Sequence, residues 1–448
     1  MQNTLDLQSL QETPSSSSVS QHKESPIIIK VYKRRLWMLF LFSLLSFLCA
    51  MLFPLYTSVA NVTVCYYKVS ENAVNWTCLL HELVYIIFVF PISCLTNRIG
   101  LRNIVLLASL TNTLACALQF ATLSPDAFAF VLISSFFASL SNIVVLSLPP
   151  YVASTWFPKN ELARACALGI SGGMLGIAVG FIYSSLLMTD DCSNIPLITE
   201  GKRNIAYSLT GINFFLLVVL IISFQNAPEH PPSITEALKQ GVMQKSPARI
   251  ILKVINTCEF LLIFIVYGVM IGSYYAYSTC LNDLLEHLFP NKNVDIGWIG
   301  LLLTLGGLIG TVVAGYVLDY SGKYKETFWG ICIFTFVTCT ISSCLLHTEQ
   351  IWVQYITITL FGFFLASMFP VGLEYAIEVV YPESEVIVTG LMNCSTMRKG
   401  IPEKDLVCPY LALRKEPSVQ GFKMSSLISR PKALSIKSFH FLWLPDKN

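Results

Sequence analysis

Cysteine and histidine are the residue types best suited to metal binding and nucleophilic chemistry, and the chain has 14 cysteines and 6 histidines. The cysteines are scattered, many of them inside apolar segments, and no two have the CxxC spacing of a metal or redox site. No two histidines have the HxxxH spacing that places two ligands on one helix face. We therefore predict no metal site, no cofactor and no enzyme activity, and interpret the cysteines as small apolar packing residues.

Ionisable residues inside apolar segments are the second group that could do chemistry. Glu259 and Glu374 are exceptions in segments that otherwise lack charge, and Glu378 lies near the end of one segment. No lysine or arginine lies well inside such a segment, whereas an anionic substrate would favour a buried cation and proton coupling would favour buried carboxylates or histidines. This scarcity favours an uncoupled carrier of a cation, held by aromatic faces.

The composition indicates which elements position these residues. The chain is 54% hydrophobic, has a mean hydropathy of +0.62, and is 12% charged, whereas soluble domains are about 25% charged. A span needs about 20 mostly apolar residues. We predict ten spans, at residues 36–60, 78–96, 103–123, 127–150, 165–188, 205–224, 255–280, 297–318, 327–347 and 351–379. The fold class is therefore an all-α polytopic membrane protein in a lipid bilayer, and the net charge of +2 gives no indication of nucleic-acid binding.

The loops between the predicted spans differ in lysine and arginine content. With the N-terminus in the cytoplasm, the outer loops hold only Lys68, Lys202, Arg203 and Lys292, and the inner segments hold most of the rest. Residues 1–35 predict a disordered cytoplasmic tail, and residues 225–252 a cytoplasmic linker. Two glycosylation sequons, at Asn61 and Asn75, fall in the first outer loop. We expect a multi-pass protein of the plasma membrane.

The chain repeats itself at an offset of about 222 residues. The matched positions after the second and eighth spans are Asn97 and Asp319, Gly100 and Gly322, and Arg102 and the pair Tyr324-Lys325. The segment WFPKNE after the fourth span likewise corresponds to VYPESE after the tenth. Two six-helix halves in parallel repeat are typical of major facilitator transporters. We predict halves at residues 36–224 and 253–396, the second of them incomplete.

The end of the chain departs from this repeat. By the same offset, VYPESE should lead into an eleventh and a twelfth span, but residues 398–448 hold ten Lys or Arg and four Asp or Glu. No window there has a spanning length free of charge. We therefore predict a helix that stops after barely three turns, then a basic divergent tail at residues 397–448. An alternative splice, a frameshift and a gene-model error would each explain this, and the sequence leaves all three open.

Six segments, taken in order, resemble one known family. They read RIGLRNIVLLAS, PPYVASTWFPKNELARACA, LGIAVGF, SYYAYSTCLNDLL, GYVLDYSGKYKET and EYAIEVVYPESEVIVTGLMN. Over residues 98–183 and 267–396, and more weakly from residue 36, the chain resembles the feline leukaemia virus subgroup C receptor family of the major facilitator superfamily. The resemblance implies facilitated transport of choline and ethanolamine, with haem export as the family's older assignment.

The resemblance also implies residues of a substrate site. Tyr275 matches the family's substrate-contacting tyrosine of span seven, and Phe53 stands where the family has a tryptophan in span one. The family's glutamines of spans five and eleven fall at Met174 and Met397. We expect Phe53, Tyr275 and Met174 to contact the substrate, and membrane packing is the alternative role for the two aromatic residues.

The resemblance to the superfamily further implies a cytoplasmic latch, which consists of a carboxylate, a glycine turn and a basic residue. The copy at Asp319 retains the carboxylate, whereas the copy at Asn97 lacks it. Glu374 and Glu378 share one helix face and form either a solvated helix end or a gate contact to basic loops. The predicted latch and gate residues are Asn97, Arg98, Arg102, Asp319, Lys325, Glu374 and Glu378.

Glycines recur at intervals of four residues in two of the spans. They are Gly172, Gly176 and Gly180 in span five and Gly306 and Gly310 in span eight. This spacing places each set on one helix face, where backbones can approach closely. In the superfamily these two spans pack against each other, so we expect smooth faces on which the halves rock around a central site.

Two functions of different classes follow. The first is facilitative uniport of choline-like or ethanolamine-like cations by alternating access, with haem as the alternative substrate. The second is a truncated form that does not transport and instead binds or regulates full-length partners.

Overall fold

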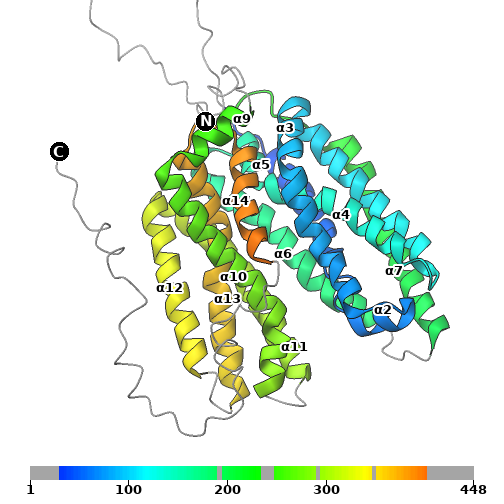
Figure 1. Ribbon diagram of the computed structural model, residues 1–448. Helices are drawn as coiled ribbons and strands as arrows, with labels where there is room; N and C mark the ends of the chain where they lie inside the picture. The colour runs from blue at the N-terminus through cyan, green and yellow to red at the C-terminus, as the bar shows by residue number, and fades with distance from the viewer. Residues whose placement is uncertain (1–29, 189–193, 234–246, 289–292, 346–349, 401–448) are drawn as a thin grey trace, which may run out of the picture. The chain divides into compact units, whose positions relative to one another are not determined.

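The described elements of the chain are all helices (Figure 1). The computed structural model describes residues 30–188, 194–233, 247–288, 293–345 and 350–400, which lie in one compact unit, residues 1–401. The helices are α1 (Arg34–Met51), α2 (Ala60–Tyr67), α3 (Glu71–Leu118), η2 (Gln119–Leu123), α4 (Phe128–Ser147), α5 (Pro149–Trp156), η3 (Lys159–Glu161), α6 (Leu162–Leu187), α7 (Ile195–Ser223), α9 (Pro247–Ile255), α10 (Cys258–Leu288), α11 (Asn293–Ser321), α12 (Tyr324–Leu345), α13 (Ile351–Val379) and α14 (Glu385–Gly400).

Nine helices in the described ranges are long and apolar enough to cross a membrane. One of them, Ala73–Leu123, has 51 residues, which at 1.5 Å per residue is about 76 Å, more than twice the thickness of a bilayer core. Gly100 interrupts this stretch with a φ of 82° and a ψ of 170°. The stretch therefore supplies two spans, and the described part of the chain supplies ten, as the sequence predicts.

Two predicted spans extend beyond the observed helices because prolines follow. α1 ends at Met51 rather than near residue 60, since Pro54 disfavours helical backbone in the residue before it. Pro149 and Pro150 likewise follow the end of α4 and begin α5, where missing N–H groups cost little. The length of an apolar run thus overestimates helix length where proline interrupts it.

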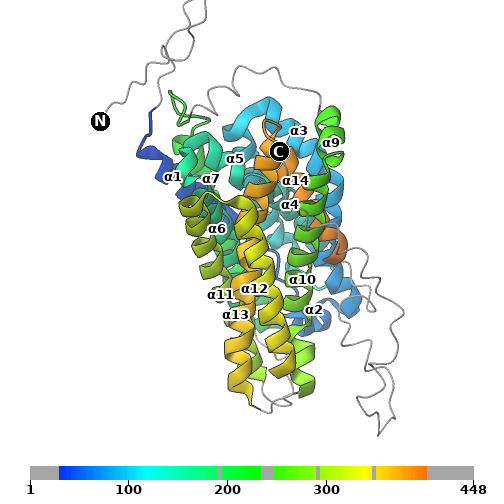
Figure 2. The ribbon, with the colours of Figure 1, turned by 90° about the vertical axis from the view of Figure 1, so that its left-hand side faces the viewer.

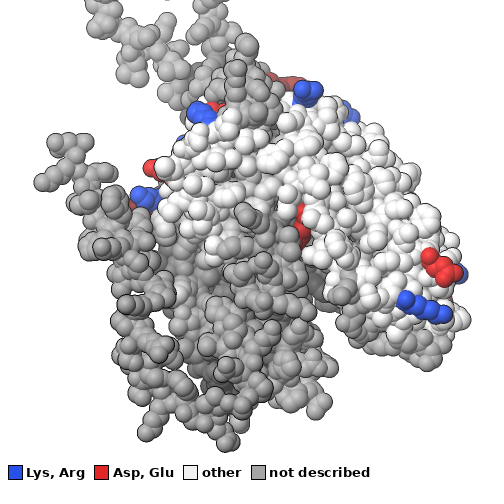
Figure 3. Space-filling view, viewed as in Figure 1, with Lys and Arg blue, Asp and Glu red and all other residues white. Residues whose placement is uncertain are grey.

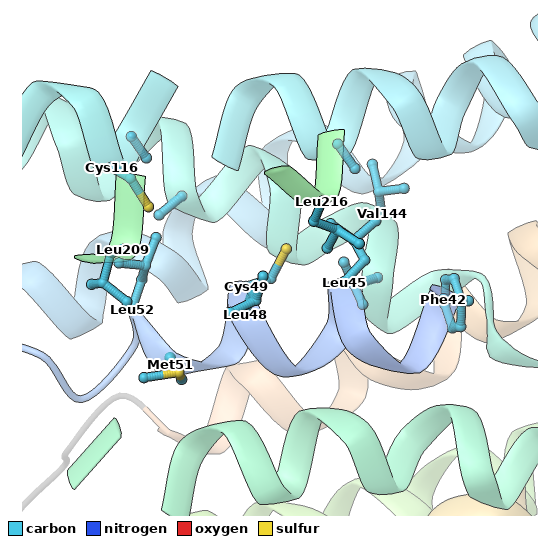
Figure 4. Close-up of a cluster of buried hydrophobic side chains, with 14 of the residues drawn as sticks. Phe42, Leu45, Leu48, Cys49, Met51, Leu52, Cys116, Val144, Leu209 and Leu216 are labelled. Atoms are coloured by element: carbon cyan, nitrogen blue, oxygen red, sulfur yellow. The ribbon is translucent and has the colours of Figure 1, made fainter. Parts of the chain in front are cut away.

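Two clusters of buried apolar side chains fill the interior. The first comes from α1 to α7, and Figure 4 shows Leu45 of α1 and Leu52 just after α1 turned toward Val144, Leu216 and Leu209. The second comes mainly from α10 to α14. The first cluster also includes Val386 of α14, and the second includes Met174 of α6. The contact between the two groups of helices is therefore itself partly apolar.

The surface between the two ends of the unit is suited to lipid. Figure 3 shows charged side chains near the ends of the described surface and few on the broad area between them. On α7, Phe214, Phe215 and Ile222 are 59%, 70% and 76% exposed. Apolar faces of this kind mark a contact with membrane or partner rather than with water. Together with the ten spans, they identify a multi-pass membrane protein.

The glycine faces pack within each group of helices rather than between the groups. An added Cβ at Gly172 or Gly176 would overlap the backbone of α1, at Ser43 and Phe47. At Gly306 it would lie 2.7 Å from Thr359 O, and at Gly310 it would overlap the backbone at Phe363, both on α13. Gly180 similarly faces Met51 and Pro54. The expectation that these glycines form the surface between the halves is wrong, because each set lies on the face toward its neighbour in the same half.

α6 and α11 do contact each other, by a different face. Gly315 of α11 lies against Ala163 and Ala167 of α6, where an added Cβ would be 2.8 Å from the Ala167 methyl. Thr311 Oγ1 lies 3.6 Å from the Met174 sulfur. The expected contact between these two spans is therefore present, but small residues other than the predicted glycines make it.

α14 lies between α10 and α3 in both ribbon views (Figures 1 and 2). Its 16 residues rise about 24 Å, less than the roughly 30 Å of a bilayer core. Gly390 contacts Val89 and Ser93 of α3. α14 therefore covers part of the second predicted span, although it is shorter than a full span itself.

Candidate functional site

A central cavity lies between the two groups of helices. The first group contributes Phe53 after α1, Glu82 of α3 and Met174 of α6. The second contributes Tyr275 of α10 and Phe369 of α13. A ligand in this cavity would therefore contact both halves of the predicted repeat.

All three residues that the sequence proposes as substrate contacts line this cavity, namely Phe53, Tyr275 and Met174. They come from positions more than 100 residues apart along the chain, so the tertiary structure brings them together. Met397 lies in α14, but its side chain is outside the described residues. Contact of these residues with a substrate remains a prediction.

Aromatic rings from both sides line the cavity. The Phe53 ring meets the His81 ring edge-on, with centroids 5.4 Å apart and an interplanar angle of 85°. Across the cavity, the Tyr275 and Phe369 rings are 6.2 Å apart at 77°. The faces of such rings carry a negative electrostatic potential that attracts organic cations.

Glu82 is a carboxylate of the cavity that the sequence interpretation missed. It lies inside the apolar stretch Ala73–Leu123 and lines the cavity. Glu259, which the sequence singled out instead, is exposed in the first turn of α10. The usable signal was an ionisable residue inside a span, which marks a functional site by default.

Asn393 of α14 is a second cavity residue that the sequence did not indicate. Its amide donates to Leu146 O at 3.0 Å, and Tyr267 Oη donates to its Oδ1 at 3.3 Å. These bonds connect α14 to α4 and α10, so the short helix contributes a fixed polar group to the cavity.

The end of the unit that holds Arg35, Arg164 and Lys253 is called here the basic end. There Asp319, at the end of α11, accepts bonds from the backbone N–H groups of Ala163 and Arg164 at 3.0 and 2.9 Å. The Arg164 side chain also donates to Asp319, with Nε 2.8 Å from Oδ2. Asp319 thus satisfies free N–H groups in the first turn of α6 and pairs with a cation.

This geometry changes the predicted latch in one respect. The basic partner of Asp319 is Arg164, from the other half, which is not among the predicted latch residues. Lys325, the basic residue of the same loop, is exposed. A repeat pattern shows which positions correspond, but it cannot show which distant residue faces them.

The second copy of the latch is uncharged. The Asn97 amide donates to Ser384 Oγ at 3.3 Å, just before α14. Arg102 reaches Ile221 O at 2.8 Å within its own half, and Arg98 is exposed. Among the described residues, neither arginine therefore bonds to the other half.

The predicted gate carboxylates differ from each other. Glu378 lies 3.6 Å from Lys159 across the two halves, which matches the expected contact to a basic loop. Glu374 is buried, with 2% of its surface exposed, so it is not a solvated helix end. Two further contacts at the basic end were not anticipated, between Lys253 and Glu383 at 2.8 Å and between Ser154 and Glu385.

One cysteine departs from the packing role expected of this residue type. Cys65 of α2 is disulfide-bonded. Ten other cysteines in the described ranges are free, and no group of three His, Cys, Asp or Glu there could hold a metal ion.

Comparison with known proteins assigns the chain to a class. The model of the Major Facilitator Superfamily matches residues 36–399. The zebrafish Choline/ethanolamine transporter flvcr2a is 33% identical over 374 residues, which cover 83% of this chain and 79% of that protein. The human Choline/ethanolamine transporter FLVCR2 is 33% identical over 391 residues, 85% of this chain and 73% of that protein.

The fold also matches solved structures. The crystal structure of the major facilitator transporter FucP in the outward conformation aligns with a TM-score of 0.67 over 85% of this chain and 92% of that one. The identity is 11%, so this likeness concerns the fold alone.

Proposed function

Since the chain belongs to the major facilitator superfamily and, within it, to the family of the choline/ethanolamine transporters FLVCR1 and FLVCR2, we propose that it is a facilitative uniporter of choline-like or ethanolamine-like cations. It works by alternating access, with the cavity as the substrate site. This class of protein is a transporter and not an enzyme.

The observation that carries the proposal is the chemistry of the cavity. Phe53 and Tyr275 present aromatic rings from opposite halves, and Glu82 adds a carboxylate. No lysine or arginine is among the described residues that line the cavity. Each contact of a cation with a ring face contributes about 0.5–2 kcal/mol. This cavity therefore favours a small organic cation.

The basic end supports alternating access. There Asp319 bonds Arg164, Asn97 bonds Ser384 and Ser154 bonds Glu385, each across the two halves. These contacts would have to break for the cavity to open toward that end. They therefore belong to one of the two states that an alternating-access carrier requires.

The proposed orientation has the basic end in the cytoplasm of a cell whose plasma membrane holds the protein. The excess of lysine and arginine in loops at this end supports it. The disulfide of Cys65 lies at the opposite end, in α2, and disulfides persist outside the reducing cytosol. Asn75, one of the two sequon asparagines, is exposed at the same end as α2.

Haem, the alternative substrate, fits the cavity less well. It carries two carboxylates, which favour lysine or arginine in a site. The only charged side chain among the described lining residues is Glu82, and its charge is negative. The regulatory alternative has one supporting observation, the 16-residue length of α14, which is short for a span.

The test is uptake of labelled choline and ethanolamine by vesicles that contain the purified full chain. We expect saturable uptake down the substrate gradient without an imposed proton gradient. Tyr275→Ala should abolish uptake and Tyr275→Phe should retain part of it, since the ring face matters more than the hydroxyl. Tyr320→Ala, at a position 96% exposed, is the matched control.

Three outcomes would contradict the proposal. Wild-type vesicles without saturable uptake would favour the regulatory alternative. Uptake of haem but of neither amine would favour the other substrate. Equal loss in both Tyr275 variants, at equal reconstitution, would exclude a mainly cation–π role for that ring.

A further inference from the structure

Glu82 has an unusual environment for a carboxylate inside a membrane span. Its Oε2 atom is buried and accepts no hydrogen bond from the part of the chain that the structure describes. A carboxylate oxygen without a donor or a cation is costly in a low-dielectric site. The side chain lines the central cavity, so a ligand there can supply the missing partner.

The chain offers no cation for this carboxylate among the described lining residues. The buried lysine, Lys202, has its ammonium 4.4 and 4.0 Å from the ring centroids of Tyr66 and Tyr67, and it donates to Thr122 O at 2.9 Å. None of these three partners lines the central cavity. Lys202 is therefore occupied elsewhere, and a cationic ligand in the cavity would supply Glu82 with the charge partner that the described lining residues lack.

Two neighbouring polar groups are also acceptors toward the cavity. Ser139 Oγ uses its hydrogen to bond Ser135 O at 2.6 Å, which leaves only its lone pairs. His81 Nδ1 lies 2.9 Å from Thr77 O, and because a carbonyl only accepts, Nδ1 carries the hydrogen. In a neutral ring Nε2 is then an acceptor. Glu82, Ser139 and His81 thus offer three acceptors to the cavity, whose lining also includes the donor-bearing side chains of Asn142 and Tyr275.

We propose that Glu82 determines specificity, so that this cavity prefers ammonium ions that carry N–H groups over their N-trimethyl counterparts. A primary ammonium can donate up to three hydrogen bonds, one of them charge-assisted to Glu82. A quaternary ammonium has the same charge but no donor, and its methyl groups hold the nitrogen farther from the carboxylate. Its binding would bury these acceptors without giving them hydrogen-bond donors, which costs free energy.

The aromatic rings alone do not produce this preference. Phe53 and Tyr275 attract either kind of cation through their faces. The acceptors Glu82, Ser139 and His81 add hydrogen-bond energy that only a ligand with N–H donors gains. The inference rests on the proposed function for its site, and it ranks primary and secondary ammonium ions above quaternary ones among the proposed substrates.

The experiment measures binding and not transport, so that it is independent of turnover. The dissociation constants of ethanolamine and choline are determined by calorimetry on the purified full chain, for the wild type, Glu82→Gln and Glu82→Asp. Glu259→Gln is the matched control, because Glu259 is exposed outside the cavity. Vesicle uptake of both compounds is measured in parallel.

We expect the wild type to bind ethanolamine about tenfold more tightly than choline, which is about 1.4 kcal/mol. Glu82→Gln should weaken ethanolamine binding by about tenfold and choline binding by much less, so that the ratio approaches one. Glu82→Asp should retain most of the preference, and Glu259→Gln should leave both constants unchanged.

Several results would overturn the inference. One is a wild type that binds choline as tightly as ethanolamine. Another is a Glu82→Gln variant in which the ratio of the choline and ethanolamine dissociation constants is unchanged. The third is a wild type that binds neither cation. If Glu82→Gln does not fold, the inference is tested by the ratio of the two dissociation constants in the wild type and in Glu82→Asp. Selective binding without uptake would refute the proposed transport while leaving this inference standing.

Discussion

The two copies of the repeated loop, at Asp319 and at Asn97, occupy matched positions but make unequal contacts. Asp319 pairs with Arg164 and accepts two backbone N–H groups of α6. Asn97 exchanges a neutral bond with Ser384 before α14. Arg164, the partner of Asp319, follows the segment WFPKNE. The matched position after VYPESE, 224 residues later, is Val388, which is fully buried. The charged pair of Asp319 and Arg164 thus corresponds to two uncharged residues, Asn97 and Val388.

This difference predicts how strongly each contact holds the two halves together at the basic end. Charge-assisted bonds contribute about 1.5–3 kcal/mol, and neutral ones about 0.5–1.5 kcal/mol. The contact at Asp319 should therefore dominate, although the Arg164 side chain is 32% exposed and solvent weakens its share. The repeat predicts where the halves meet, but not how strongly each meeting point contributes.

The largest effect is expected from Asp319→Asn, which breaks the charged copy. It removes the ion pair and weakens the bonds to α6, so the closed state should lose roughly 1.5–3 kcal/mol. The measurement is the alkylation rate of Cys166, which is fully buried in α6 two residues after Arg164. We expect a rise of about tenfold or more, followed peptide by peptide with mass spectrometry.

Lys325→Ala is the control for this variant, because Lys325 is exposed in the same loop region. It should leave the rate at Cys166 unchanged. An Asp319→Asn protein with wild-type protection of Cys166 would show that the charged copy does not hold the basic end closed.

A smaller effect is expected from replacing the turn glycines of the two copies, Gly100 and Gly322, by alanine, because the two replacements should lower stability by different amounts. Gly100 has a φ of 82° and a ψ of 170°, a conformation nearly restricted to glycine, and an added Cβ would lie 2.7 Å from Asn226 Oδ1. Gly322 has a φ of 63°, and an added Cβ would meet nothing within 4 Å. Gly322→Ala should cost about 1–2 kcal/mol, and Gly100→Ala more than that.

Thermal unfolding of the two variants in detergent measures this difference. Gly100→Ala should lower Tm further than Gly322→Ala. Asn226→Ala in the Gly100→Ala background should recover part of the loss, because it removes the nearest atoms. Equal Tm values for the two single variants would indicate that the turns are equivalent.

The smallest effect is expected from Asn97→Ala, which removes the neutral copy. Loss of the bond to Ser384 should cost about 0.5–1.5 kcal/mol, so alkylation of Cys166 should rise less than in Asp319→Asn. Asn103→Ala is the matched control, since the Asn103 amide bonds Ile99 within its own helix at 3.0 Å. A rise as large as that of Asp319→Asn would contradict the ranking of the two copies.

The sequence by itself determined the membrane class, the ten spans and the repeat. Each span is a local property, because lipid requires about 20 apolar residues in succession. The glycine turns at Gly100 and Gly322 are equally local, and both have the positive φ that favours glycine. Phe53 and Tyr275 were found only through a resemblance, since nothing in their own neighbourhoods distinguishes them from aromatic residues that pack in the membrane.

Only the tertiary structure decided which faces meet. In a span every face is apolar, so the helical period does not mark the side toward the interior. This is why the glycines of α6 were assigned to the wrong neighbour, and why Glu82 was overlooked in favour of the exposed Glu259. The pairing of Arg164 with Asp319 joins residues 155 positions apart. Such a contact depends on how two helices pack against each other. The residues near Arg164 carry no information on which distant helix packs there, and the same holds for the residues near Asp319.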